Sequence, residues 1–468
     1  MDFTQLIVSI DDFMYTYILI IMLAAIGIFL SIKTKFVQFR LFPESFRVVM
    51  EKSDDKEAIS SFQALMVATA SRVGTGNIAG VATAIVAGGP GALFWMWLMA
   101  MIGGASAFVE STLAQVYKQR DGKIFKGGPA YYIQTALGMR WLGIIFSIFL
   151  IITFAYGFNG LQAFNIASAF EYYSNDWANS QVPVYIGIIL AVTSALLFFG
   201  GTDKISKVSS ILVPIMAIFY IVIGLAVVFS NIEKLPQVLS LILSNALDFK
   251  SIFGGLMGSC LVMGVKRGLF SNEAGMGSAP NAAAAANVSH PTKQGLVQVL
   301  SVFIDTAIIC STTGFLVLFA EKYTVHGELN GIPLVQQSIG SVFGPLGIHF
   351  TTFAVALFAF TSLIGNYFYA EFNVRFISDS KLVMLLFRLS CVAMVFYGAI
   401  NSMDAAWALA DITMGLMAIV NIVAIFLLSG TASKVLDDYM VQKKAGKNPV
   451  FNAKKVGIDN TEPGIWDK

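Results

Sequence analysis

Long apolar stretches alternate with short polar connections along almost the whole chain. Eleven stretches are long enough to cross a hydrocarbon core of about 30 Å as helices. They span residues 13–32, 61–87, 91–117, 141–170, 183–200, 208–230, 252–283, 295–320, 345–377, 382–400 and 405–428. The pattern predicts an all-α polytopic membrane protein with eleven transmembrane helices.

Lysine and arginine are unevenly shared between the two sets of connections. With the N-terminus outside, the outer connections hold only Lys234, Lys250 and Lys322, and nearly all other basic residues lie in the inner ones. Because cytoplasmic loops retain positive charge, this asymmetry predicts an extracellular N-terminus and a cytoplasmic C-terminus. We therefore expect a multi-pass protein of the cell (plasma) membrane, embedded in the lipid bilayer.

Two of the apolar segments are interrupted by glycine and polar residues. The first break, in 61–87, reads A-T-A-S-R-V-G-T-G-N-I-A-G, and the second, in 252–283, reads V-K-R-G-L-F-S-N-E-A-G-M-G-S-A-P-N. The two segments run in opposite directions, and five segments fall in 61–230 and five in 252–428. This arrangement indicates two inverted five-helix repeats. An extra helix and linker (1–60) precede them, an extracellular connection (231–251) joins them, and a cytoplasmic tail (429–468) follows.

An unwound turn in mid-membrane exposes carbonyl groups from one half-helix and N–H groups from the next. These ends suit a cation and a carboxylate, respectively. The alternative is a G-x-x-x-G packing ridge formed by Gly76 and Gly80. Arg72, Thr75 and Asn77 favour a functional break, because a charge at this depth costs roughly 2.5–3.5 kcal/mol. For the second break, the alternative is a short loop with solvated charges.

Composition narrows the functional classes further. The chain is 56% hydrophobic and only 12% charged, which excludes a soluble globule. A net charge of +2 indicates no nucleic-acid partner. The three cysteines and three histidines lack the spacing of metal ligands. We therefore expect no cofactor and no covalent chemistry.

The sequence G-G-P-G-A-L-F-W-M-W-L-M-A-M-I-G, from Gly88 to Gly103, resembles a signature of the sodium:alanine/glycine symporter (AGCS) family. The second break resembles that family's other hallmark, and the resemblance covers essentially the whole chain. It implies membership of the amino acid-polyamine-organocation superfamily and a LeuT-type fold with one added N-terminal helix. It also implies import of alanine or glycine, with sodium as the coupling ion. A monomer would suffice for such a site.

The resemblance also implies functional residues. The amides of Thr75 and Gly76 are expected to hold the substrate carboxylate, with the second break facing them. The expected substrate-binding set is Thr75, Gly76, Asn77, Asn159, Gln162, Phe270, Ser271, Gly275, Met276, Gly277 and Asn366. The expected sodium ligands are Ala70, Val73, Phe358, Thr361 and Ser362.

Some of these residues have plainer interpretations. Adjacent threonine and serine often bond to their own helix, which would remove Thr361 and Ser362 from the ion site. Asn159, Gln162 and Asn165 share one helical face and could simply bond neighbouring helices. Both alternatives remain open for the sequence alone.

Charged residues in the outer half of the membrane indicate a gate. We expect Arg267 to pair with Asp404 or Asp411 across the substrate vestibule, because an unpaired charge there is costly. Arg72, Glu273 and Asp305 form either a fixed polar network or part of the transport site.

Three other functional classes are less well supported by the residues. An intramembrane enzyme using carboxylates would need a nucleophile and base or a metal cluster, and the sequence contains neither arrangement. An ion channel would need a ring-like filter. A nucleotide-driven pump would need a phosphate-binding loop.

Overall fold

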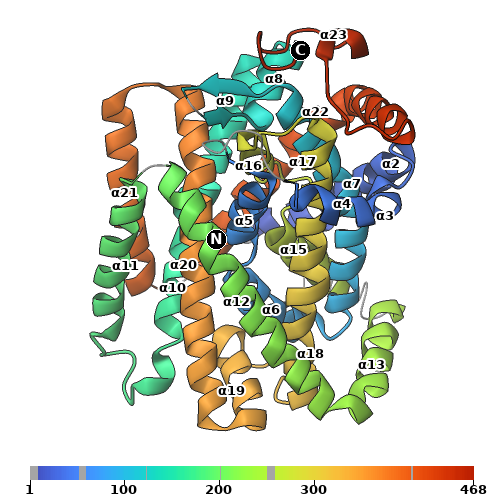
Figure 1. Ribbon diagram of the computed structural model, residues 1–468. Helices are drawn as coiled ribbons and strands as arrows, with labels where there is room; N and C mark the ends of the chain where they lie inside the picture. Colours follow the sequence, from blue (N-terminus) through green and yellow to red (C-terminus); the bar gives the residue numbers. More distant parts are fainter. Residues whose placement is uncertain are drawn as a thin grey trace.

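The computed structural model of the protein describes residues 9–51, 59–122, 124–200, 202–249, 259–401 and 404–467. Most of its helices run side by side in one bundle (Figure 1). Helix α23 (Ala453–Val456), helix α8 (Pro129–Leu137) and the C-terminus lie at one end. Helices α13 (Leu235–Leu247) and α19 (Gly331–Phe343) lie at the other end.

Among the described residues, eight helices are long and apolar enough to cross a membrane. Three predicted spans are missing from that set. One is α11 (Val182–Phe198), which is apolar but shorter, and the others are the two interrupted segments. The count of eleven therefore stays a prediction. The eight helices span Ser9–Lys33, Ala92–Val116, Arg140–Tyr173, Ile205–Ser230, Pro291–Ala320, Pro345–Ile377, Lys381–Ile400 and Ala410–Lys444.

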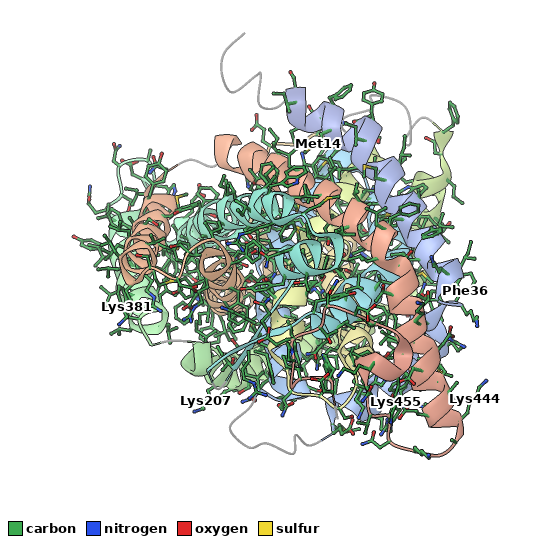
Figure 2. The ribbon with its side chains drawn as sticks, turned by 90° about the horizontal axis from the view of Figure 1, so that it is seen from above. Met14, Phe36, Lys207, Lys381, Lys444 and Lys455 are labelled. Atoms are coloured by element: carbon green, nitrogen blue, oxygen red, sulfur yellow. The ribbon has the colours of Figure 1, made fainter. Side chains whose placement is uncertain are left out.

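The N-terminal helix lies on the outside of the bundle. Its first part, η1 (Met14–Leu19), continues into α2 (Ile20–Lys33), and short helices α3 (Val37–Arg40) and α4 (Phe42–Val49) follow. Figure 2 shows this helix between the labelled Met14 and Phe36, beside α22 (Asp404–Lys444). The first and last long helices of the chain are therefore neighbours.

The first half of the bundle begins with a broken helix. Ser60 and Gln63 form a reciprocal capping box that satisfies two N-terminal donors and starts α5. The helices of this half are α5 (Ser61–Arg72), η2 (Thr75–Asn77), α6 (Ala79–Gly88), α7 (Ala92–Val116), α9 (Arg140–Leu150), η3 (Ile151–Phe158), α10 (Asn159–Ser168), η4 (Glu171–Tyr173), α11 and α12 (Thr202–Ser230).

The second half also contains a broken helix, formed by α15 (Cys260–Asn272) and α16 (Pro280–Ala285). Helix α22 continues to Lys444, well beyond the predicted end of its span near 428. The connection between the halves holds η5 (Ile232–Lys234) and α13. The other helices of the second half are α17 (Pro291–Phe303), η7 (Ile304–Cys310), α18 (Ser311–Ala320), α19, α20 (Pro345–Ile377) and α21 (Lys381–Ile400).

The two broken helices lie side by side at the centre of the bundle (Figure 1). Helix α6 packs against α15, and α5 packs against α16. Beyond these contacts, the Asn287 N–H donates to the Ile59 carbonyl at 2.9 Å, which closes the ends of α5 and α16 together. The polar residues of both breaks therefore meet in the interior.

The C-terminal segment packs on one end of the bundle. Phe451 and Trp466 are buried, and the Trp466 indole N–H donates to the Gln115 carbonyl at 3.0 Å. A short antiparallel hairpin lies next to it, formed by β1 (Gln119–Asp121) and β2 (Ile124–Lys126). This tail is therefore part of the folded protein.

Candidate functional site

The first break begins where α5 ends at Arg72. Gly74 is extended, and a Cβ added to it would lie 2.3 Å from the Ser362 hydroxyl, so a larger residue does not fit. The Gly74 N–H donates to the Asn77 side-chain oxygen at 3.0 Å. This bond holds the tight turn η2 and starts α6 in a new direction.

Residues from α10 meet this turn. The Gln162 side-chain oxygen accepts hydrogen bonds from the Thr75 N–H at 3.1 Å and from the Thr75 hydroxyl at 2.9 Å. The Asn165 amide donates to the same hydroxyl at 2.9 Å. Gly76 faces Phe270, since an added Cβ would lie 2.3 Å from its ring. The structure therefore brings Thr75, Gly76, Gln162 and Phe270 together.

Asn77 connects the first break to α15 and η7. Its amide donates to the Asp305 carboxylate at 2.6 Å and to the Ser271 hydroxyl at 3.0 Å. Its backbone carbonyl accepts from the Thr313 hydroxyl at 2.6 Å. All four residues are buried. Asn77 is thus surrounded by oxygen atoms from three helices.

The second break turns by means of left-handed backbone conformations. Glu273, Gly275 and Gly277 have φ values of 55°, 84° and 87°. Such values are readily adopted by glycine but are uncommon for a residue with a side chain. The Glu273 carboxylate accepts from the Ser71 hydroxyl at 2.9 Å and from the Ser278 hydroxyl at 2.5 Å. Glu273 therefore ties the second break to the end of α5.

Side chains at the glycine positions of the second break would not project towards the first break. An added Cβ at Gly275 would approach Ser106, and one at Gly277 would approach Asn421. The Gly275 N–H donates to Glu110 at 3.3 Å, and Asn421 donates to the Gly275 carbonyl at 3.0 Å. Helices α7 and α22 therefore hold this turn on the side away from Thr75. Met276 is fully buried beside it.

Asn366 on α20 extends the network towards α10. It donates to the Asn159 side-chain oxygen at 3.1 Å and accepts from the Ser71 hydroxyl at 2.8 Å. The Asn159 amide nitrogen and two guanidinium nitrogens of Arg72 are buried without a partner among the described residues. The remaining Arg72 nitrogen donates to Gln298 at 3.0 Å. Such unpaired buried donors are costly and indicate a site that takes polar occupants.

The expected sodium ligands lie where α5 ends against α20. The Ser362 hydroxyl is 2.9 Å from the Ala70 carbonyl, 3.3 Å from that of Ser71 and 3.4 Å from that of Val73. Thr361 instead donates to the Phe358 carbonyl of its own helix at 2.9 Å. The structure therefore gathers Ala70, Val73 and Ser362, whereas Thr361 and Phe358 are bonded to each other.

Charged residues lie between α15 and α22, on the side of the breaks that is predicted to be extracellular. The Arg267 guanidinium contacts both carboxylate oxygens of Asp411, at 3.4 and 3.2 Å, and lies 4.5 Å from the centre of the Trp407 ring. Trp407 in turn contacts Phe270, with ring centres 5.3 Å apart. The side chain of Asp404 lies outside the described residues.

Sequence reasoning missed several members of the site. Ser71, Glu110 and Asn421 each bond a residue of a break, as described above. Glu110 is the only ionisable side chain of α7, and Asn421 is the only polar residue between Met414 and Leu428, so their rarity is a signal that could have identified them. Ser71 carries no comparable signal, because serine is frequent in membrane helices.

Comparison with known proteins gives the family. The model of the sodium:alanine symporter family matches residues 1–453. The chain belongs to the sodium:alanine symporter family. As a member it is a sodium-coupled symporter and not an enzyme, which confirms the functional interpretation of its sequence.

Relatives of this symporter match it over nearly the whole length. It is 48% identical over 466 residues to the amino-acid carrier protein AlsT of Bacillus subtilis (strain 168), covering 99% of this chain and 98% of AlsT. It is 46% identical over 443 residues to the probable sodium/glutamine symporter GlnT of the same organism, covering 94% of this chain and 91% of GlnT. The name of AlsT specifies no particular amino acid, whereas that of GlnT names glutamine.

Solved structures similar to the symporter share its fold. MhsT in complex with L-phenylalanine aligns with a TM-score of 0.56 at 13% identity, covering 83% of this chain and 99% of that one. At this identity the likeness shows the LeuT-type fold alone, as the sequence resemblance implied.

Proposed function

We propose that this symporter imports alanine and glycine together with sodium, by alternating access to a site between the two breaks. The observation that carries the proposal is the convergence of the Ala70 and Val73 carbonyls on the Ser362 hydroxyl. Carbonyl groups at the end of a half-helix are partially negative, because they lack intrahelical donors. Such neutral and partially negative oxygens suit a monovalent hard cation.

Sodium would lie to one side of the line between the Ser362 hydroxyl and the Ala70 carbonyl, where the Val73 carbonyl also points. The hydroxyl would rotate and offer a lone pair, so that Ala70, Val73 and Ser362 present three oxygens. Thr361 would have to release the Phe358 carbonyl before it could contribute. We therefore assign the main role on α20 to Ser362.

The substrate carboxylate would bind at the start of η2. Gln162 already presents an oxygen to the Thr75 N–H and hydroxyl, which is the pattern of contacts that a carboxylate would make. The Gly76 N–H has no hydrogen-bond partner among the described residues. We propose that the carboxylate displaces the Gln162 oxygen and takes both amides. The ring of Phe270 then limits the space for the substrate side chain.

The balance of buried charges supports the binding of a cation near the two breaks. Among the described residues around the breaks and at the proposed gate, buried carboxyl groups outnumber buried cations by two, and excess negative charge in a membrane is costly. The acids are Asp11, Glu110, Glu273, Asp305 and Asp411, and the bases are Arg72, Lys266 and Arg267. A bound sodium ion would offset part of that excess.

Alternating access would come from rocking of the five-helix repeats 61–230 and 252–428 around the fixed site. The Arg267–Asp411 pair and Trp407 close the side that we propose to be extracellular. Glycine and alanine are proposed because Phe270 lies directly on Gly76, which leaves little room for a longer side chain.

Uptake by reconstituted vesicles tests the proposal. Labelled alanine should accumulate only with an inward sodium gradient, and accumulation should disappear when an ionophore dissipates that gradient. Uptake that is unchanged without sodium would refute sodium coupling at this site.

A competition panel tests the substrate class in the same vesicles. Unlabelled glycine and alanine should compete with labelled alanine, and glutamine should compete poorly. Strong competition by glutamine would contradict the role of Phe270 as a limit on side-chain size.

A further inference from the structure

The N-terminal helix meets the proposed outer gate through buried charges. Lys266 of α15 forms an ion pair with Asp11, which precedes η1, and a second ion pair of 3.0 Å with Asp411 of α22. Arg267 also contacts Asp411, at 3.2 Å. The side chains of Asp11, Lys266, Arg267 and Asp411 are only 3%, 10%, 7% and 1% exposed. Three separate elements thus contribute to one charged cluster.

The cluster is electrically neutral only if Asp11 belongs to it. Without Asp11, Asp411 alone would face two cations whose side chains are at most 10% exposed. A buried charge left without its partner is strongly destabilising, whereas a complete pair is roughly neutral in energy. Asp11 therefore supplies the second negative charge on which the closed arrangement of Lys266 and Asp411 depends.

Tyr15 and Met14 of η1 fix the helix in the same place. The Tyr15 hydroxyl donates to the Asp411 backbone carbonyl at 3.2 Å, and the Lys266 ammonium lies 5.2 Å from the centre of the Tyr15 ring. An added Cβ at Gly415 would lie 2.4 Å from the end of Met14, so η1 and α22 approach too closely for a side chain there. The helix therefore touches the turn of α22 that carries Asp411.

Some polar atoms of the closed cluster lack hydrogen-bond partners. One Asp11 oxygen and the Arg267 Nε are buried without a partner among the described residues. Opening would give these atoms access to water, which compensates for part of the loss of the ion pairs. Such a cluster can therefore differ little in free energy between its open and closed arrangements.

We propose that Asp11 is a positioning residue of the outer gate, and that the N-terminal helix is thereby a working part of that gate. Asp11 holds Lys266, and Lys266 holds Asp411 in the arrangement that closes over the substrate. This inference rests on the proposed function, which assigns these residues to the extracellular side. It goes further than the proposed function, which assigns no role to Asp11 or to the N-terminal helix.

The substitution Asp11→Asn distinguishes a gating role of Asp11 from a purely structural contact with Lys266. Weakening the closed state raises the fraction of outward-open protein, which lowers the apparent KM for external substrate. The same change slows closure, so the maximal rate falls as well. We expect both to fall by about two- to thirty-fold, the range of coupling that a single network residue produces. Rates are normalised to folded protein.

Matched variants complete the experiment. Asp11→Glu keeps the charge and should behave as the unmodified protein, and so should Asp12→Asn, a half-buried neighbour with the same change of charge. If Asp11→Asn does not fold, Tyr15→Phe replaces it, because it removes the hydrogen bond of the N-terminal helix to the Asp411 carbonyl without changing any charge, and it should lower KM and the maximal rate in the same direction. A lower maximal rate with unchanged KM in Asp11→Asn would overturn the proposal.

The rate of thiol labelling reports how often the gate is open, without a measurement of transport. Cys310 is fully buried beside Asn77 and Ser271, so it reports access to the breaks. In protein carrying Cys260→Ser and Cys391→Ser, an impermeant thiol reagent added outside should label Cys310 several-fold faster after Asp11→Asn. Unchanged labelling would contradict the gating role. If sodium-driven uptake is absent in the unmodified protein, the proposed function fails, and this assay still decides whether Asp11 controls access.

Discussion

The replacement Ser362→Ala tests the sodium site most directly. The Ser362 hydroxyl bridges α20 to the Ala70 carbonyl at 2.9 Å and approaches the Ser71 and Val73 carbonyls at 3.3 and 3.4 Å. Alanine fits the same space, because it only removes one oxygen atom. The substitution should therefore weaken sodium binding while the fold is retained.

The size of the effect follows from the two states of the site. Without sodium, the hydroxyl makes an ordinary hydrogen bond, worth about 0.5–1.5 kcal/mol net. With sodium, it contacts an ion, and contacts to charged groups are worth about 1.5–3 kcal/mol. The difference is roughly 1–1.5 kcal/mol. It corresponds to about a tenfold rise in the sodium concentration for half-maximal uptake.

The assay is initial alanine uptake as a function of external sodium, with vesicles matched for protein content. Thr361→Val is the matched control, because the Thr361 hydroxyl bonds the Phe358 carbonyl of its own helix. This control should shift sodium dependence by less than about twofold. An unchanged sodium dependence in Ser362→Ala, or equal shifts in both variants, would refute the assignment of Ser362 as the ligand.

Two further predictions address the substrate site and the effect of pH. Gly76→Ala should abolish alanine uptake, because its Cβ would lie 2.3 Å from the Phe270 ring, whereas Gly80→Ala meets its neighbours at 3.8 Å or more and should retain uptake. Similar rates for these two variants at equal protein content would contradict the reasoning. Burial lowers the pKa of His290 despite its 3.1 Å contact with Asp438, so the folded protein favours the neutral ring. Because the unfolded chain protonates near pH 6.5, the melting temperature in detergent should fall as pH drops below about 6.5, and His290→Gln should flatten that decline.

The two breaks could be predicted from the sequence because their signal is local. Gly74, Gly76, Asn77 and Glu273 are glycine and polar residues inside apolar segments, where an intact helix would otherwise satisfy the backbone. The local sequence does not show which hydroxyl of α20 faces the carbonyls of α5. Ser362 and Thr361 are adjacent and chemically alike, and only the rotation of α20 against α5 distinguishes them.

Other features depend on contacts between distant parts of the chain. Asp11 and Lys266 are 255 residues apart, and no pattern near either residue identifies the other as its partner. Helix α22 continues beyond the predicted apolar span at 405–428, because hydropathy reports the apolar part of a helix and not its end. The helix continues through Lys434 and Asp437 to Lys444, where its polar turns pack on other parts of the protein.

The pairing of the first long helix with the last one also has a consequence for biogenesis. Tyr15 and Lys33 each bond a residue 396 positions later in the chain, Asp411 and Ser429 respectively. At a synthesis rate of about 5–20 residues per second, their partners emerge roughly 20–80 s afterwards. Until then the first helix can pack only against elements made earlier, such as α7, and it lacks its contacts with α22. Completion of this helix pair is therefore among the last steps of assembly, and a chain truncated before α22 would leave its first helix packed on α7 alone of these two neighbours.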